Sequence, residues 1–238
     1  MITRRVFLKS AAAVGMAAIG AAALAACGES RGAASPSSAS PEPPSQASAV
    51  SDLPVEETAG SSEPSPPAAA TPDSIVVYFS RAGENYEVGY VERGNTAVIA
   101  DMVAAKTGSD VFEIAPTQPY PEDYDECLDV AIAERDAGAR PAYSGDVDLA
   151  PYKTVYLGYP LWWRDLPMCV YTFLESHDWA GKEVRPFCTH GGMGIMGTVE
   201  SVAAVCAGAK VGEALSMDGA TAQYDRATAE SAVDSWLG

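Results

Sequence analysis

Ser-Ile-Val-Val-Tyr-Phe-Ser, at residues 74–80, is the stretch that decides the fold of this 238-residue chain. β-Branched and aromatic side chains follow one another there without the alternation that marks a half-exposed strand. Such a run is typical of a central strand in a parallel sheet, which is buried on both faces. Similar runs predict four further strands, over residues 110–114, 154–158, 183–189 and 210–217.

Helical spacing of apolar side chains marks the segments between these strands. It predicts helices over residues 95–107, 121–138, 167–175, 198–206 and 225–237. Strand and helix alternate throughout, so we expect an α/β fold with a doubly wound parallel sheet and helices on both faces. Ligands of such sheets bind beyond the carboxyl ends of the strands, which directs attention to the loops after the first, third and fourth strands.

The first 26 residues have the layout of an export signal. Arg4 and Arg5 precede a weakly apolar run and resemble a twin-arginine signal, with an ordinary secretory signal as the alternative. The end of this segment, Leu24-Ala-Ala-Cys27, resembles a bacterial lipobox, with a plain cleavage site as the alternative. We therefore expect a lipid on Cys27 and a protein anchored to the outer face of the bacterial cytoplasmic membrane.

Residues 27–73 are rich in serine, proline and alanine. This composition offers too few apolar side chains to offset the entropy lost on ordering, so we expect a disordered tether. The folded domain is then expected to span residues 74–238.

Net charge and cysteine usage narrow the classes of function. The net charge of −17 repels nucleic acid and favours a basic protein partner, although acidity that only keeps the protein soluble is an equal alternative. Five cysteines occur without a CxxC pair, and the two histidines lie far apart, so we expect no metal site. Cys188 and Cys206 could pair outside the cell, but burial as small apolar side chains is the favoured interpretation.

The loop after the first strand could hold a phosphate group. Ser80 and Thr96 offer hydroxyls, and the helix predicted to begin at Asn95 offers free backbone N–H groups at its N-terminus. Capping of that helix is the alternative role of Asn95.

The loops after the third and fourth strands could hold a flat aromatic group. Trp162 and Trp163 are adjacent and cannot both face the core, so we expect one to close the core edge and the other to cover a ligand. The glycines within 191–194 allow close approach of the backbone, whereas His190 by itself is more often structural. A phosphate end, an aromatic wall and a backbone edge together suit FMN.

Four segments resemble the flavodoxin family, in the branch whose third-strand loop reads Pro-x-Trp-Trp. They are Phe79-Ser-Arg-Ala-Gly83, residues 116–124, Gly158-Tyr-Pro-Leu-Trp-Trp163 and Pro186-Phe-Cys-Thr-His-Gly-Gly192. The resemblance implies a five-stranded sheet in the order 2-1-3-4-5 and one noncovalently bound FMN. It implies cofactor contacts from Ser80, Arg81, Ala82, Gly83, Asn95, Thr96, Pro160, Leu161, Trp162, Trp163, Thr189, His190, Gly191 and Gly192.

The chain departs from the family at the phosphate loop. Ala82 stands where the family has a hydroxyl, and residues 84–93 intervene before Gly94. Tyr86 and Tyr90 in this insertion could cover the flavin or pack the loop.

The resemblance implies an electron-transfer protein that works through FMN with a basic or membrane-bound redox protein. Outer-sphere transfer of this kind needs no side chain as a catalytic acid or base. A flavin-dependent NAD(P)H or quinone reductase is the alternative. A third reading is a binding module that keeps the fold without the flavin, which the substitution at Ala82 and the insertion make conceivable.

Overall fold

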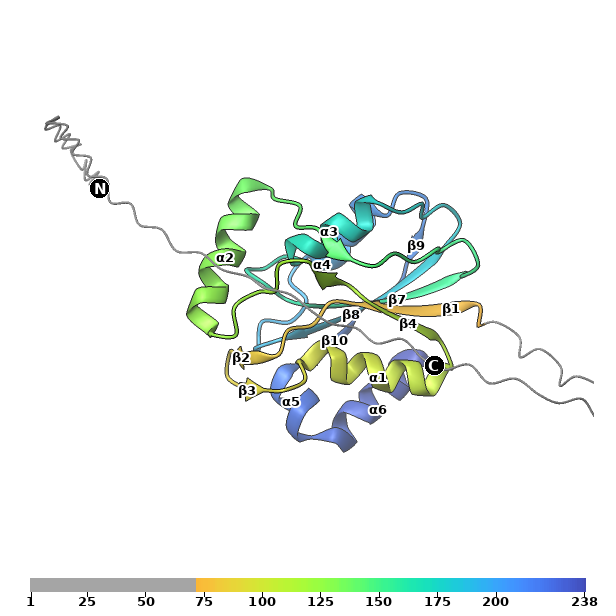
Figure 1. Cartoon of the computed structure of the whole chain (residues 1–238). Helices are drawn as coiled ribbons and strands as arrows, with labels where there is room; N and C mark the ends of the chain where they lie inside the picture. Colours follow the sequence, from red (N-terminus) through yellow and green to blue (C-terminus); the bar gives the residue numbers. More distant parts are fainter. Residues whose placement is uncertain (1–71) are drawn as a thin grey trace, which may run out of the picture. The chain divides into compact units, whose positions relative to one another are not determined.

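The computed structural model describes residues 72–238, so the predicted export signal, the lipidation site and nearly all of the predicted tether lie outside the described residues. The described part is built on one parallel sheet (Figure 1). Neighbouring strands across the sheet are β4 (Asp110–Glu113), β1 (Ser74–Tyr78), β7 (Thr154–Pro160), β8 (Glu183–His190) and β10 (Leu215–Asp218). The predicted order 2-1-3-4-5 is therefore confirmed.

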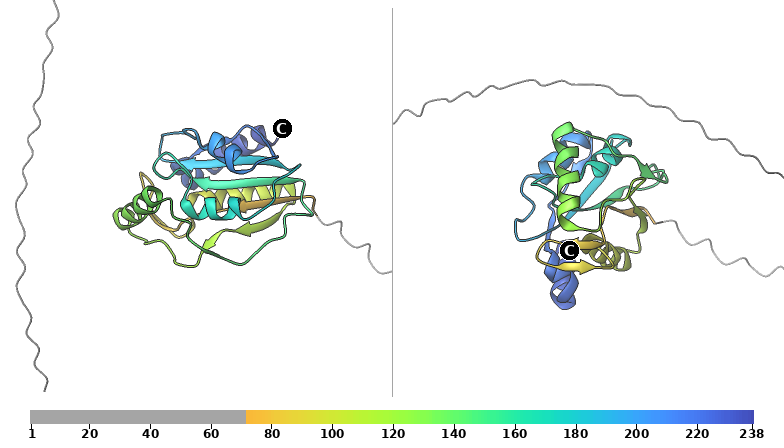
Figure 2. Two further views of the ribbon diagram at one scale, coloured as in Figure 1. Left: turned by 90° about the horizontal axis from the view of Figure 1, so that it is seen from above. Right: turned by 60° about the vertical axis from the view of Figure 1, so that its left-hand side comes forward.

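Helices cover both faces of this sheet (Figure 2). One face carries α1 (Asn95–Thr107), α5 (Gly219–Tyr224) and α6 (Arg226–Leu237), and the other carries α3 (Met168–Glu175) and α4 (Thr198–Val205). Side chains of β1 alternate between the two cores, since Ile75 and Val77 belong to one cluster and Val76 and Tyr78 to the other. The first strand is thus buried on both faces, as its apolar run predicts.

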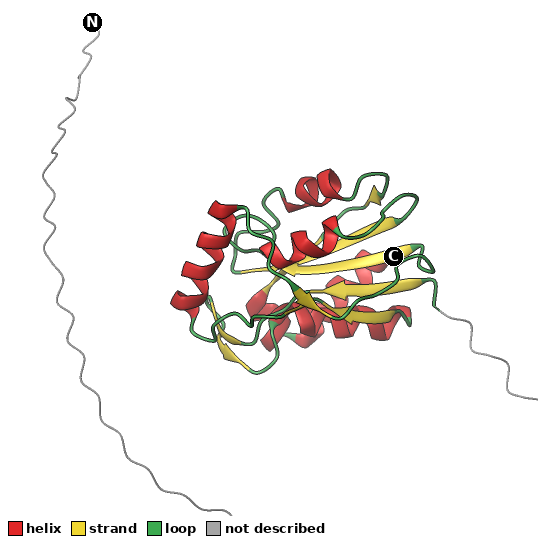
Figure 3. Ribbon diagram, turned by 45° about the horizontal axis from the view of Figure 1, so that its top comes forward, coloured by secondary structure: helices red, strands yellow, loops and turns green. Residues whose placement is uncertain are grey.

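The helix α2 (Tyr124–Ala137) departs from this layered arrangement. It stands across the carboxyl ends of the strands, to the left in Figure 3, and none of its residues belongs to either core cluster. Asp123 caps the helix by accepting a hydrogen bond from the backbone N–H of Glu126 at 2.9 Å. The helix therefore begins three residues after the predicted start at Pro121, because the side-chain cap decides the first turn.

The predicted strand over 210–217 is wrong as a single element, because it divides into β9 (Lys210–Val211) and β10. Gly212 donates its N–H to the carbonyl oxygen of Val184 in β8 at 2.8 Å. Pro186 lies two residues further along β8, and its backbone faces the same neighbouring strand as that of Val184. Proline has no N–H, so it cannot donate the next hydrogen bond between the two strands. The chain leaves the sheet there and rejoins it opposite Phe187.

Short elements that the sequence did not predict complete the fold. They are α5 and two small antiparallel pairs, β2 (Gly83–Asn85) with β3 (Gly89–Val91), and β5 (Ala115–Pro116) with β6 (Tyr143–Ser144). The β2–β3 hairpin is formed by the insertion at residues 84–93. None of the helices within residues 72–238 combines the length and the apolar character needed to cross a membrane.

The four cysteines of the described residues are free and buried. Burial raises the pKa of Cys188 and of Cys206 to about 12, so both thiols stay protonated at neutral pH. The favoured interpretation, small buried apolar side chains, is confirmed for these residues.

Candidate functional site

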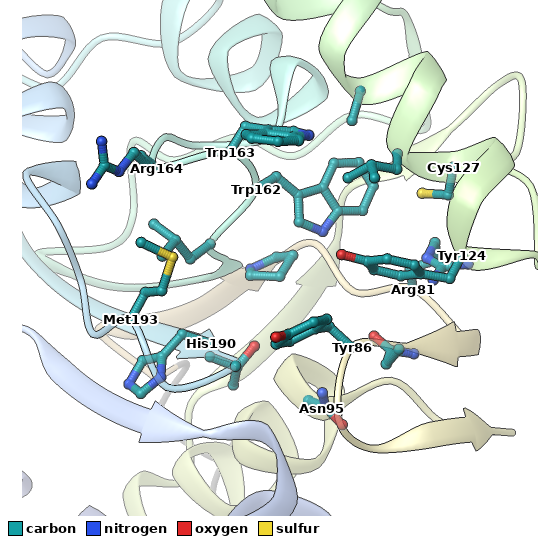
Figure 4. A pocket seen from close by; sticks show the side chains of 17 residues that line it. Arg81, Tyr86, Asn95, Tyr124, Cys127, Trp162, Trp163, Arg164, His190 and Met193 are labelled. Carbon is teal, nitrogen blue, oxygen red and sulfur yellow. The ribbon is translucent and has the colours of Figure 1, made fainter.

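A cavity of about 450 Å³ opens at the carboxyl ends of β1, β7 and β8 (Figure 4). All three loops singled out in the sequence reach it, so the topology brings together segments far apart in the chain. The predicted site residues that line it are Arg81, Asn95, Pro160, Leu161, Trp162, Trp163, Thr189, His190 and Gly191. Its other lining residues are Asn85, Tyr86, Tyr124, Cys127, Leu128, Ala131, Arg164 and Met193.

The remaining predicted site residues lie beside the cavity and do not line it: Ser80, Ala82, Gly83, Thr96 and Gly192. Thr96 is 1% exposed, and its hydroxyl lies 2.7 Å from that of Thr189. Ser80 Oγ accepts a hydrogen bond from the backbone N–H of Ala97 at 3.0 Å, which satisfies one free donor at the start of α1.

Asn95 does not cap α1, so the capping role considered for it is wrong. Gly94 occupies the cap position without a side-chain bond. A Cβ on Gly94 would lie 2.3 Å from Ser80 Oγ and 2.4 Å from the carbonyl oxygen of Arg81, which shows how closely the loop and helix approach. Asn95 Oδ1 instead accepts a hydrogen bond from Gln223 Nε2 at 2.9 Å.

The loop after β7 turns back within two residues. Trp162 and Asp165 exchange both backbone N–H···O=C bonds at 3.0 Å, and the two residues between them, Trp163 and Arg164, have φ of 48° and 69°. The left-handed region is costly for residues other than glycine, by about 1–2 kcal/mol each. Asp165 Oδ1 accepts hydrogen bonds from Leu166 N and from the Tyr171 hydroxyl, both at 2.8 Å, and thereby fixes the turn.

The expectation that one tryptophan of this turn closes the core edge is confirmed, and the expectation that the other covers a ligand stays a prediction. Trp162 packs edge-to-face against Phe79 and Tyr120, with ring centroids 5.3 and 4.8 Å away, and so closes the core edge. Trp163 is 45% exposed at the rim of the cavity.

His190 is held by both ring nitrogens. Its Nδ1 accepts the backbone N–H of Gly192 at 3.2 Å, which leaves Nε2–H to donate to Ser216 Oγ at 2.8 Å. Burial lowers the pKa of His190, although Asp218, 4.0 Å from Nδ1, opposes the shift. Ser216, His190 and Asp218 thus have the composition of a nucleophilic triad but the wrong tautomer, since Nε2 donates to the serine and does not accept its proton.

The insertion hairpin is tied down and carries Tyr86 to the cavity. The Arg81 guanidinium donates to the carbonyl oxygens of Pro121 at 2.6 Å and Glu122 at 3.0 Å, and also to that of Glu84 in β2. The Tyr86 ring packs so closely on Gly191 that a Cβ there would lie 2.6 Å from Cδ1 of the ring. The two roles considered for Tyr86 are covering the flavin and packing the loop. The structure places Tyr86 in the lining of the cavity.

Sequence reasoning missed the lining residues of α2. Tyr124, Cys127, Leu128 and Ala131 follow the i, i+3, i+4, i+7 spacing of one helix face, so their shared face is readable from the sequence. The sequence does not predict that this face lines the cavity, because helices of this fold ordinarily pack on the sheet.

The family model described as flavodoxin matches residues 75–233. A putative flavoprotein structure from Bacteroides eggerthii is 30% identical, with a TM-score of 0.53, and the match covers 69% of this chain and 94% of that one. A putative flavoprotein from Bacteroides uniformis is also 30% identical, with a TM-score of 0.52 and coverage of 69% and 99%.

A flavoprotein from Lactobacillus acidophilus, solved in complex with FMN, is 18% identical over 69% of this chain and 98% of that one. Its TM-score of 0.50 supports the shared fold. The search of curated proteins found no match. Since the family model spans all five strands of the sheet, and two solved structures share 30% identity, the chain belongs to the flavodoxin family.

Proposed function

We propose that this protein holds one FMN in the cavity and passes electrons to a redox partner at the outer face of the membrane. The carrying observation is the cavity itself, in which loops after β1, β7 and β8 of a flavodoxin-family domain meet. FMN is the cofactor that membership of this family implies.

The residues around the cavity fit FMN. Its volume of about 450 Å³ falls within the roughly 300–1,000 Å³ of small-molecule sites. Trp162 and Trp163 provide an aromatic wall, and the loop after β8 adds Thr189, His190 and Gly191 to the lining. Ser80 Oγ accepts from Ala97 N, which leaves its own O–H free to donate to a phosphate at the start of α1.

Bound FMN supplies the redox chemistry, and the side chains of the chain bind and shield it. No Asp or Glu is among the described residues that line the cavity, and the His190 ring is engaged on both nitrogens. Such a lining suits electron transfer without a protein acid or base. The Arg81 guanidinium, fixed by three carbonyl oxygens, adds a positive charge that favours the phosphate and the anionic reduced flavin.

The location of the protein follows from the predicted lipid on Cys27. Several acyl chains at about 0.8 kcal/mol per buried CH₂ hold a protein firmly at a bilayer. The mass of the mature N-terminal peptide tests this directly. Diacylglyceryl on Cys27 is the expected result, and an unmodified thiol there contradicts the anchor.

The visible absorption spectrum of the purified protein tests the flavin. We expect the two bands of oxidised flavin, and release of a chromophore that a phosphatase converts to riboflavin. A folded protein that stays colourless when FMN is added would leave only the flavin-free binding module.

A reductase is the second candidate, and the enclosure of the cavity by α2 favours it. A carrier needs only an accessible flavin edge, whereas an enzyme also needs room for a small substrate. Rapid bleaching of the flavin by NADPH supports the reductase; bleaching by a reduced protein partner alone supports the carrier.

A further inference from the structure

An acidic and aromatic surface lies exposed on the β2–β3 hairpin and on α5. Tyr90 of β3 is 61% exposed and Tyr224 of α5 is 67% exposed, the two largest exposed fractions among the large apolar side chains of residues 72–238. The Tyr224 hydroxyl donates to the carbonyl oxygen of Val88 in the hairpin turn at 2.8 Å, so the two elements meet (Figure 1). We call the surface made by Glu84, Glu87, Tyr90, Glu92 and Tyr224 the hairpin surface.

The pairing of β2 with β3 directs this surface outward. Glu84 lies directly opposite Tyr90 in the antiparallel pair, so the two side chains project from the same face. The neighbouring pair, Gly83 with Val91, is buried and belongs to the opposite face. One face of the hairpin therefore packs on the domain, and the other presents a carboxylate beside an aromatic ring.

Carboxylates give the hairpin surface its charge. Its three glutamates are exposed, and none of them forms an ion pair with another described residue. The Arg81 guanidinium contacts the carbonyl oxygen of Glu84 and not its carboxylate. Arg93, which follows the hairpin, is paired with Asp101 at 2.6 Å. Such a surface attracts a basic partner and repels a second copy of this acidic chain.

The hairpin also places this surface next to the cavity. Tyr86, in the turn of the same hairpin, lines the cavity, and its ring packs on Gly191. None of the five residues of the hairpin surface is among the described residues that line the cavity, so the surface stays available when the cavity is filled. A protein bound to the hairpin surface would therefore lie beside the proposed flavin site.

We propose that the hairpin surface is the docking site for a basic redox protein that takes electrons from the flavin. This rests on the proposed function, since the electrons come from FMN in the cavity. Lysine and arginine side chains of the partner pair with the three glutamates. The rings of Tyr90 and Tyr224 provide the large contact area that is typical of the centre of an interface, and they accept the same cations on their faces.

Oxidation of the reduced, FMN-loaded protein by the basic protein cytochrome c tests the proposal. One electron passes from the flavin to each ferric haem, which becomes ferrous, and stopped-flow absorbance of the flavin gives the second-order rate constant. The hairpin variant combines Glu84→Gln, Glu87→Gln and Glu92→Gln. The control variant removes the same charge from exposed positions outside the hairpin surface and combines Asp146→Asn, Asp178→Asn and Glu213→Gln.

The rates are compared at 0.15 M salt, where charges act over about 8 Å. The hairpin variant should react with cytochrome c about tenfold or more slowly than the parent, and the control variant should stay within about twofold of it. Tyr90→Ala should slow the reaction about fivefold or more, whereas Val111→Ala, which shortens an exposed side chain of β4, should not. Ferricyanide, a small anion that needs no docking surface, should oxidise every variant at least as fast as the parent.

Equal rates in the hairpin and control variants would overturn the proposal, because no effect would then belong to the hairpin surface. A dimer in light scattering that Tyr90→Ala dissociates would also overturn it, because a second copy would then occupy the surface. Both outcomes leave the proposed function standing. A protein whose absorption spectrum shows no bound FMN contradicts the proposed function itself and the docking proposal with it.

Discussion

Gly158 in β7 shows at the scale of one residue how a single position at the centre of this sheet leaves no room for a side chain. A Cβ there would lie 2.2 Å from Cζ and 2.3 Å from Cε2 of the fully buried Phe187, and 2.9 Å from Tyr78 Cβ. Neither neighbour can move without displacing the core, so Gly158→Ala should lower the free energy of unfolding by about 2–3 kcal/mol. Urea denaturation measures the loss.

Gly212→Ala is the matched control for this substitution, because the nearest atom to its new Cβ would be Val184 O at 3.7 Å. Its effect should stay within about 0.5 kcal/mol. Equal destabilisation by both variants would contradict the packing argument.

His190 makes the stability of the domain depend on pH. Burial lowers its pKa from 6.5 in the folded state, so the unfolded chain takes up a proton more readily. The stability that this histidine contributes is therefore fully present above about pH 6.5 and is lost as pH falls through the lower folded pKa. His190→Gln should flatten the decline of unfolding free energy between about pH 7.5 and 5 relative to the parent. Parallel declines in urea titrations would show that this ring is not responsible.

At the scale of elements, the position of the β2–β3 hairpin depends on few contacts with the rest of the domain. Arg81 ties it to the loop before α2, and the Tyr224 hydroxyl donates to the carbonyl oxygen of Val88 at 2.8 Å. Arg81→Ala removes a charged donor from three carbonyl oxygens, and each such bond contributes about 1.5–3 kcal/mol. We expect faster amide hydrogen exchange throughout the hairpin and FMN affinity reduced by about tenfold or more.

The control for this prediction is Arg93→Ala, which also removes an arginine near the hairpin. Arg93 pairs with Asp101 at 2.6 Å on the surface, and exposed pairs contribute about 0–1 kcal/mol. Its hairpin amides should exchange as in the parent. Similar exchange in both variants would mean that the Arg81 bonds do not hold the hairpin.

The elements also mark what the sequence could and could not predict. The sheet order, α1 and the closure of the core edge by a tryptophan follow from buried strand runs, helical spacing and the size of the indole ring. The break between β9 and β10 depends on Pro186 of a neighbouring strand, and the position of α2 depends on long-range packing. The hydrogen bond that Ser80 Oγ accepts and the one between the hydroxyls of Thr96 and Thr189 form only in the folded protein.

At the scale of the whole molecule, the net charge of −17 should control how fast a protein partner arrives. Oppositely charged partners attract one another over a distance of about one Debye length, which is about 30 Å at 0.01 M salt and about 8 Å at 0.15 M. Oxidation of the reduced protein by the basic protein cytochrome c should therefore slow by about tenfold or more over this range of salt. Stopped-flow absorbance of the flavin follows the rate.

Ferricyanide separates steering from any general effect of salt on the flavin, because it accepts an electron but carries negative charge. Screening removes repulsion in this case, so its rate should rise with salt while that of cytochrome c falls. Opposite slopes would mean that the acidic surface selects basic partners. If both rates change in the same direction, or if neither depends on salt, the acidic residues serve solubility alone. The choice of partner would then depend on the rim of the cavity, where Trp163 and Met193 are exposed.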